Sequence, residues 1–165
     1  MNDQPRVRVR GARRADTESL VTFSLAMAWE TERRRLDKAR LRCGIRAVLS
    51  NPHRGSFIIA EVTERGRRRI VGQLMVTSEW SDWRNGVFWW VQSVYVTPAW
   101  RRRGIYRSLY QYVLEKAKSD PTVCGIRLYV ARTNRIAQTV YRRVGLVKTN
   151  YIVYEQDFVL DSVTR

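Results

Sequence analysis

The sequence predicts one α/β domain with a mixed sheet and a single parallel crossover. The first observation is the nearly unbroken apolar run Val87–Val96, which is typical of a strand buried on both faces. The second is an amphipathic helix pattern soon after it, and the third is a further strand at Gly125–Val130. A strand, a helix and a second strand in that order form a parallel crossover unit. The chain length of 165 residues fits one domain, and we expect residues 1–165 to form it.

Each expected element rests on its hydrophobic period and its end signals. Apolar residues at every second position predict strands, and apolar residues at steps of three and four predict helices. Asp16 and Asp37 suit the N-caps of two helices, and Gly145 suits the residue after the last helix. The expected order is strand 5–11, helix 17–34, helix 37–49, strands 56–63, 69–78 and 87–96, helix 105–117, strand 125–130, helix 134–144 and strand 151–158.

The chain is strongly basic, with a formal net charge of +16. Only four of its 31 basic residues are lysine, so arginine makes up the rest. Arginine binds phosphate and carboxylate groups through its planar guanidinium. The charge therefore favours a phosphate-rich cofactor, an acidic substrate or nucleic acid as a ligand. A compositional bias toward arginine, with most side chains merely solvated, accounts for many of these residues equally well.

Several classes of protein are disfavoured by the sequence. Its apolar stretches are too short to span a membrane, and the polar N-terminus lacks a signal-peptide core, so we expect a cytoplasmic protein with no membrane partner. Two cysteines, Cys43 and Cys124, and one histidine, His53, are too few for a zinc site built from such ligands. A Cys–His nucleophilic pair has no supporting motif, and two separate buried thiols are expected.

A phosphate site is predicted where the apolar strand gives way to a helix, at Arg101–Gly104. The first N–H groups of a helix are unpaired and carry partial positive charge, which makes the helix start an anion site. Gly104 lets the backbone approach a ligand closely, and Arg107 adds charge one turn later. An exposed basic turn is the alternative, but cations at a helix N-terminus oppose its dipole unless an anion binds there.

The sequence has neither the GxxxxGK[ST] loop of nucleotide-binding P-loops nor the GxGxxG loop of dinucleotide-binding folds, so these phosphate ligands are not supported. Two other motifs indicate a different ligand. The stretch Val94–Tyr106 resembles the central motif of the GNAT acetyltransferase superfamily, [RQ]-x-x-G-x-[GA], with Arg101 and Gly104 matching and Tyr106 standing where glycine or alanine is usual. Residues 134–145 resemble the segment that follows it, N-x-x-A-x-x-x-Y-x-x-x-G, through Asn134, Ala137, Tyr141 and Gly145.

The resemblance implies a GNAT fold, in which a mixed, mostly antiparallel sheet of about six to seven strands has a split parallel pair at its centre and about four flanking helices. It also implies acetyl-CoA as the co-substrate, with pantetheine paired to the backbone of the central strand and the pyrophosphate held at the helix start. We expect the Tyr106 side chain to point away from the phosphates. The implied cofactor-binding residues are Val94, Tyr95, Val96, Arg101, Arg102, Arg103, Gly104, Ile105, Tyr106, Arg107, Asn134 and Tyr141.

The implied chemistry is direct attack of an amine on the acetyl thioester in a ternary complex, with Tyr141 as general acid toward the departing thiolate. Some members of the superfamily carry a glutamate as general base where this chain has Trp90. Glu79 and Asp82, in the loop before that strand, are the nearest candidates for the general base. An ordinary structural role in forming the turn accounts for both residues equally well. Glu30 and Glu32 could add acidic recognition of an amine.

Further interpretations concern the acceptor and partners. An aromatic cluster could line the acceptor pocket, namely Trp80, Trp83, Trp89, Trp90 and Tyr95, although the strand tryptophans equally suit a core position. A final strand and exposed aromatic residues favour a homodimer. The alternatives are a nucleic-acid- or ribosome-associated protein, which the even spread of arginine disfavours, and a GNAT module that binds acyl-CoA without catalysis.

Overall fold

The computed structural model describes residues 6–64 and 66–160, which form two compact parts, 6–129 and 130–160. The first part contains a five-stranded sheet whose strands follow each other in chain order. Neighbouring strands are antiparallel except for the last pair, which is parallel. The strands are β1 (Val7–Gly11), β2 (Ser56–Glu64), β3 (Arg67–Ser81), β4 (Gly86–Val96) and β5 (Val123–Arg127).

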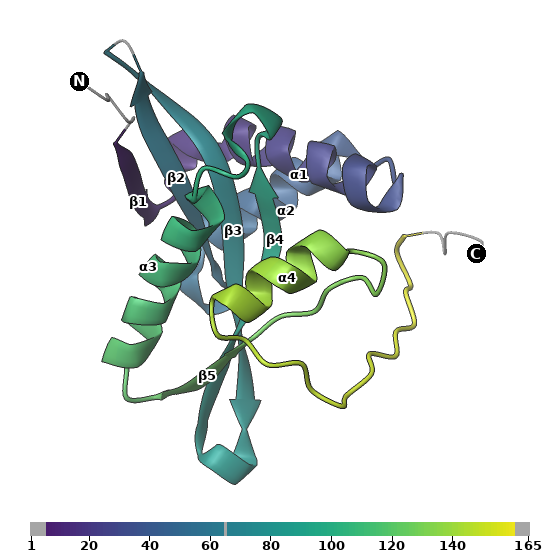
Figure 1. The fold of residues 1–165 in the computed structure, drawn as a ribbon. Coiled ribbons are helices and arrows are strands. Elements are labelled where there is room, and N and C mark those ends of the chain that lie inside the picture. Colours follow the sequence, from purple (N-terminus) through teal and green to yellow (C-terminus); the bar gives the residue numbers. More distant parts are fainter. Residues whose placement is uncertain (1–5, 65, 161–165) are drawn as a thin grey trace. The chain divides into compact units, whose positions relative to one another are not determined.

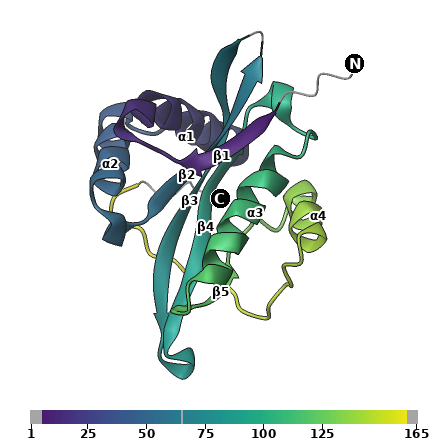
Figure 2. The ribbon, with the colours of Figure 1, turned by 90° about the vertical axis from the view of Figure 1, so that its left-hand side faces the viewer.

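Helices cover both faces of this sheet (Figure 1 and Figure 2). One face carries α1 (Thr17–Glu32) and α2 (Lys38–Ser50), and the other carries α3 (Ile105–Ser119). Residues of opposite parity on the strands supply the two cores, because successive side chains point to opposite faces. The α3 side is packed with Leu74, Val91, Ile105 and Leu109 among others. On the other side Leu20 and Ile45 of the helices pack against Phe57 and Ile59 of β2.

Four short 3-10 helices connect or precede these elements: η1 (Arg14–Asp16), η2 (Pro52–Arg54), η3 (Asp82–Arg84) and η4 (Pro98–Trp100). Asp37 caps α2 as expected, because its carboxylate accepts a hydrogen bond from the Arg40 N–H at 2.7 Å. Asp16 also precedes its helix as expected, but its side chain makes no capping bond there. Instead its carboxylate accepts from Arg10 at 2.8 Å and from the Arg13 N–H at 2.7 Å.

The parallel pair β4–β5 is split, as the fold class requires. Pairing runs from Val87 opposite Val123 to Trp90 opposite Arg127, and β4 then continues alone to Val96. The α/β fold with a mixed sheet and a parallel pair is therefore confirmed. Within the described residues the sheet has five strands, and β5 is its outermost strand.

In the second part, α4 (Arg135–Arg143) is the regular element among residues 130–160. The chain leaves it through Gly145, whose φ of +91° is the left-handed conformation expected after a helix. The strand predicted over Tyr151–Phe158 is wrong, because these residues form no strand. Alternating apolar residues show a preference for extended backbone, but a strand also needs a neighbour with which to exchange hydrogen bonds.

Two further expectations can be compared with the described residues. Among residues 6–64 and 66–160, no helix is both long enough and apolar enough to cross a bilayer. The expectation of two buried thiols is wrong for Cys43, which is exposed on α2, while Cys124 on β5 is half-buried.

Candidate functional site

A bulge interrupts β4 shortly after β5 ends. Gln73 of β3 pairs with Tyr95 and Met75 pairs with Gln92, so Ser93 and Val94 together face one residue of β3. Ser93 has a φ of +49°, a left-handed conformation that a serine rarely adopts. An extra residue of this kind bends a strand and redirects the next backbone groups. The structure thus places a residue in a strained backbone conformation close to the point where β4 and β5 separate.

The buried side chain of Gln73 holds this bulge in place. Its Nε2 donates to the backbone carbonyl of Ser93 at 3.3 Å and to Ser24 Oγ of α1 at 3.1 Å. Gln73 is 0% exposed, so its side-chain amide is shielded from water. Sequence reasoning missed this residue. The sequence showed one polar residue inside an apolar strand, but it did not indicate which backbone group that side chain would bind.

The backbone of Val96 is turned toward the open edge of β4. The Thr97 N–H donates to the carbonyl of Val71 on β3 at 2.9 Å. In an antiparallel pair, residues alternate between pointing their backbone groups at the neighbour and away from it. Val96, one residue earlier, therefore points away from β3, as does Val94 two residues before it. These are the two backbone positions expected to pair with pantetheine.

The predicted phosphate turn has the geometry of an anion site. Gly104 caps α3 with a φ of +79°, and the first bond of the helix runs from the Ser108 N–H to the Gly104 carbonyl at 2.9 Å. The N–H groups of residues 105–107 precede that bond, so the helix itself leaves them unpaired. Gly72 of β3 lets the helix start lie close to the sheet, because a Cβ there would meet Ile105 Cγ2 at 3.0 Å.

The arginines of this turn are used in different ways. Arg101 is exposed but already bonded to the protein, because its Nε donates to the Val96 carbonyl at 2.9 Å and its guanidinium pairs with Glu30 at 2.5 Å. Arg103 stacks on Trp100 at 5.0 Å from the ring centre. Arg102 and Arg107 are exposed and form no ion pair within the described chain.

The Tyr106 side chain contacts a second tyrosine of the same helix. Its ring lies 6.1 Å from that of Tyr110, one turn further along the helix. The backbone N–H of Tyr106 therefore stays at the helix start while the ring lies against the next turn. That the ring points away from bound phosphates stays a prediction.

The two carboxylates predicted as base candidates lie apart. Glu79 of β3 accepts from the Trp90 indole N–H at 2.5 Å and pairs with Arg127 of β5 at 2.6 Å. Asp82 begins the turn between β3 and β4, where it accepts from the Trp83 N–H at 2.9 Å. At about 3.3 Å per residue, the start of β4 beside this turn lies roughly 26 Å from Val94. Glu79 contacts Trp90 and Arg127, the last residues paired between β4 and β5 before the split, whereas Asp82 contacts neither.

The predicted aromatic cluster is dispersed over the sheet. Trp89 packs on the α3 side, while Tyr95 is buried against Phe23 of α1 at 5.4 Å between ring centres. Trp80 and Trp83 are exposed at the β3–β4 end of the sheet. Trp90 lies on the same face as Glu79, next to Tyr129 at 6.0 Å. Of the four tryptophans, Trp90 belongs to the last pair between β4 and β5, and Tyr95 lies beyond the split on the opposite side of the bulge.

Glu30 does not stand free to recognise an amine. Its carboxylate accepts from the Tyr95 hydroxyl at 3.1 Å and from Arg101 at 2.5 Å. Burial, with a further contribution from Glu30, raises the pKa of Tyr95, so this hydroxyl stays protonated at neutral pH. Glu30 therefore joins the C-terminal end of α1 to β4 and to the phosphate turn.

In the second part of the chain, the two motif residues lie at the start and within α4. Asn134 caps the helix, because its side-chain oxygen accepts from the Ala137 N–H at 3.0 Å. Tyr141 lies in the last turns of the same helix, and burial raises the pKa of its hydroxyl above the ordinary value near ~10. A protonated hydroxyl at neutral pH is the state that a general acid requires.

The comparisons agree with this fold. A family model described as the acetyltransferase (GNAT) family matches residues 15–146. The crystal structure of a possible acetyltransferase from Clostridium difficile 630 is similar with a TM-score of 0.83 and 35% identity, over 93% of this chain and 99% of that chain. No curated protein matches the chain.

Two more distant structures share the fold. A predicted acetyltransferase from Clostridium acetobutylicum, solved with acetyl-CoA, has a TM-score of 0.72 at 18% identity, over 92% of this chain and 96% of that one. An aminoglycoside N-acetyltransferase solved in complex with CoA has a TM-score of 0.71 at 15% identity, over 96% and 99%. From the family match and the 35% identical structure we conclude that this chain belongs to the GNAT family of acetyltransferases.

Proposed function

We propose that this protein transfers the acetyl group of acetyl-CoA to a primary amine by direct attack within a ternary complex. The observation that carries the proposal is the bulge at Ser93–Val94, placed where β4 separates from β5 and followed by the Gly104 turn. One continuous segment therefore offers backbone donors for a thioester and an anion site for a pyrophosphate. Two relatives of the same fold were solved with CoA or acetyl-CoA, which agrees with this ligand.

The cofactor would extend along the open edge of β4. Val94 and Val96 would exchange hydrogen bonds with the amide groups of pantetheine. The N–H groups of residues 102–107 would hold the pyrophosphate, helped by the charge of Arg102, Arg103 and Arg107. Arg101 would act indirectly, because its bonds to Glu30 and to the Val96 carbonyl fix the turn relative to the strand.

In the reaction, the nitrogen lone pair of the neutral amine attacks the thioester carbon and forms a C–N bond. The carbonyl oxygen becomes an oxyanion, and the N–H of Val94 after the bulge would stabilise it. The C–S bond then breaks and the electron pair leaves with sulfur. Tyr141 would donate a proton to that thiolate, and the attacking nitrogen, which is positively charged after attack, would lose one proton that returns through water to Tyr141. The products are free CoA and the acetylated amine.

The amine must lose a proton before or during attack, because a free ammonium has a pKa near ~10. Of the two candidate carboxylates, Glu79 is the one that contacts the last β4–β5 pair before the split. We therefore assign Glu79 the role of accepting the proton through water. Its bond from Trp90 places the carboxylate beside the position where some family members carry a glutamate.

The test is to measure acetyl-CoA binding by calorimetry and then thiol release with a panel of amines. We expect micromolar binding and amine-dependent release of one CoA thiol for each N-acetyl group formed. Absence of acetyl-CoA binding would remove the proposal. Binding without transfer to any amine would leave a non-catalytic acyl-CoA module. The panel should include polyamines, aminoglycosides, amino acids and peptides.

A further inference from the structure

The C-terminal end of α1 carries an open hollow that the proposed reaction does not yet use. Its volume is about 340 Å³, and it is lined by Leu25, Trp29, Arg34, Arg35 and Leu36. This volume matches the lower end of the range for small-molecule sites. All of its lining residues belong to α1 and the loop that leads to α2, so the hollow is local to the first part of the chain.

The backbone explains how the loop forms one wall of the hollow. Arg33 ends α1 in a left-handed conformation with a φ of +54°. Its N–H still donates to the Trp29 carbonyl, and the Arg34 N–H donates to the Ala28 carbonyl, both at 3.2 Å. These bonds turn the chain back over the last helical turn. As a result, Arg35 returns to the ring of Trp29.

Two guanidinium groups share this one indole. Those of Arg33 and Arg35 each lie 5.7 Å from the ring centre of Trp29, whose residue surface is 46% exposed. Within the described residues neither arginine forms an ion pair. Two cations on one ring repel each other, and an anion placed between them removes that repulsion. Apolar walls from Leu25 and Leu36 lower the local dielectric and strengthen such a bond.

Two of the three acidic residues next to this loop are used elsewhere, because Glu30 is bonded to Tyr95 and Arg101 and Asp37 caps α2. The third, Glu32, is exposed and forms no ion pair with either arginine within the described residues. Arginine presents a planar pair of donors that matches carboxylate and phosphate groups. The chemistry of the hollow is therefore that of a site for an organic anion with an apolar or planar body. The net charge of +16 adds a field that attracts anions and repels polycations.

The hollow lies on the same helical turn as a residue that contacts β4. Trp29 precedes Glu30, whose carboxylate accepts a hydrogen bond from the Tyr95 hydroxyl at 3.1 Å, and Tyr95 directly follows the bulge at Ser93–Val94. An acceptor anchored in the hollow would extend past this turn toward the bulge with its amino group.

We propose that the amine acceptor is a small acidic molecule whose carboxylate or phosphate group binds between Arg33 and Arg35 over Trp29. The inference rests on the proposed acetyltransferase function and adds the substrate class. It excludes polycationic amines as preferred acceptors.

Matched pairs of amines test the inference. Phenylalanine and phenethylamine differ by one carboxylate, and O-phosphoethanolamine and ethanolamine differ by one phosphate. In at least one pair, kcat/KM for the acidic member should exceed that of its partner about tenfold or more. This is the change in affinity expected when one hydrogen bond to a charged group is gained. The pair that responds identifies the anionic group. Spermidine should be a poor acceptor.

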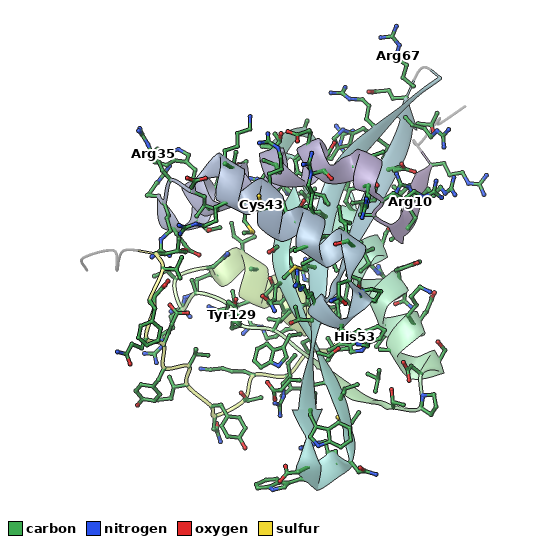
Figure 3. The ribbon with its side chains drawn as sticks, turned by 180° about the vertical axis from the view of Figure 1, so that it is seen from behind. Arg10, Arg35, Cys43, His53, Arg67 and Tyr129 are labelled. Atoms are coloured by element: carbon green, nitrogen blue, oxygen red, sulfur yellow. The ribbon has the colours of Figure 1, made fainter. Side chains whose placement is uncertain are left out.

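A double variant tests the location. Arg33→Gln with Arg35→Gln should raise KM for the acidic acceptor about tenfold and leave KM for acetyl-CoA unchanged. The control, Arg67→Gln with Arg68→Gln, removes the same charge from the β2–β3 hairpin. Arg35 and Arg67 lie at well-separated places in this part of the molecule (Figure 3). The control should keep the preference for the acidic acceptor.

Several outcomes would overturn the inference. Equal rates within both pairs, a preference for spermidine, or an equal loss in the control variant would each do so. If no amine is acetylated, calorimetry of phenylalanine and O-phosphoethanolamine on the protein saturated with CoA takes the place of the kinetics. Absence of binding by both compounds then removes the acidic-acceptor site. A failure of acetyl-CoA itself to bind removes the proposed function instead.

Discussion

The side-chain amide of Gln73 donates a hydrogen bond to the backbone carbonyl of Ser93 at 3.3 Å, from a position that water does not reach. Ser93 needs this bond because its left-handed backbone takes its carbonyl out of the regular ladder of β3 and β4. The same amide also bonds Ser24, so α1 and the bulge are fixed by one group.

We therefore expect Gln73→Leu to disturb the bulge and leave the Ser93 carbonyl without its donor. A buried acceptor left unpaired costs about 1–3 kcal/mol, and the displaced Val94 N–H would serve the oxyanion less well. The expected result is a kcat reduced about tenfold or more with acetyl-CoA binding changed by less than about threefold. Steady-state kinetics and calorimetry measure the two. In the control Ser24→Ala, which keeps the bond to Ser93, kcat should stay close to that of the wild type.

Exposed arginines at the start of α3 should govern cofactor affinity through the phosphates alone. Arg102→Gln combined with Arg107→Gln should weaken acetyl-CoA binding about tenfold and reduce its dependence on salt. Acetylpantetheine, which lacks the phosphates, should bind both proteins equally. A similar loss for acetylpantetheine would show that the turn had been distorted.

Gly72 should be needed for the packing of α3 on the sheet. In Gly72→Ala the new Cβ would meet Ile105 Cγ2 at 3.0 Å and the Tyr95 carbonyl oxygen at 3.2 Å, and the backbone atom has little room to move. Crowding of this kind typically costs about 1–3 kcal/mol of unfolding free energy. Urea unfolding measures it. The matched change Gly11→Ala, also in a strand but with open space around the Cβ, should cost less.

The buried ion group of Arg10, Asp16 and Glu61 should make stability depend on pH. Hydrogen bonds from Arg10 lower the pKa of both carboxyls, so the stability they add is present above their ordinary pKa values near ~4 and lost as pH falls below them. Arg10→Gln would leave two buried carboxylates without a cationic partner, at a cost of about 3–5 kcal/mol at pH 7. The gap in unfolding free energy between the wild type and this variant should narrow at pH 3. Arg6→Gln, a change of an exposed arginine near the start of β1, should show no such gap at either pH.

Tyr141→Phe tests the general acid. The variant should lower kcat sharply and leave acetyl-CoA affinity nearly unchanged, because the ring is kept and the proton is lost. Acyl donors whose thiol has a lower pKa need less help in leaving, so they should recover part of the lost rate. Unchanged turnover in the variant would remove the acid role from Tyr141.

The parts of the structure that depend on residues close together in the sequence could be predicted from the sequence. The apolar run of β4, the Gly104 turn and the cap of Asp37 each follow from a few consecutive residues. Gln73 could not be assigned a role, because its partner Ser93 lies in another strand. Arg101 was expected at the phosphates, yet its guanidinium is held by Glu30, which is far away in the chain. The strand expected at residues 151–158 failed for the same physical reason, since local pattern does not supply a pairing partner.

Trp29 and Glu30 are adjacent in the chain, and the first lines the hollow while the second holds the phosphate turn through Arg101. Successive helical residues are rotated by about 100°, so one helix can meet both requirements only in a single register. Insertion or deletion of one residue before this point would turn both side chains away from their positions. Exchange of residues in the loop at 33–36 would change only the hollow. Evolution could therefore give this fold a new acceptor by substitution in that loop, while the length of α1 between Ser24 and Glu30 would remain fixed.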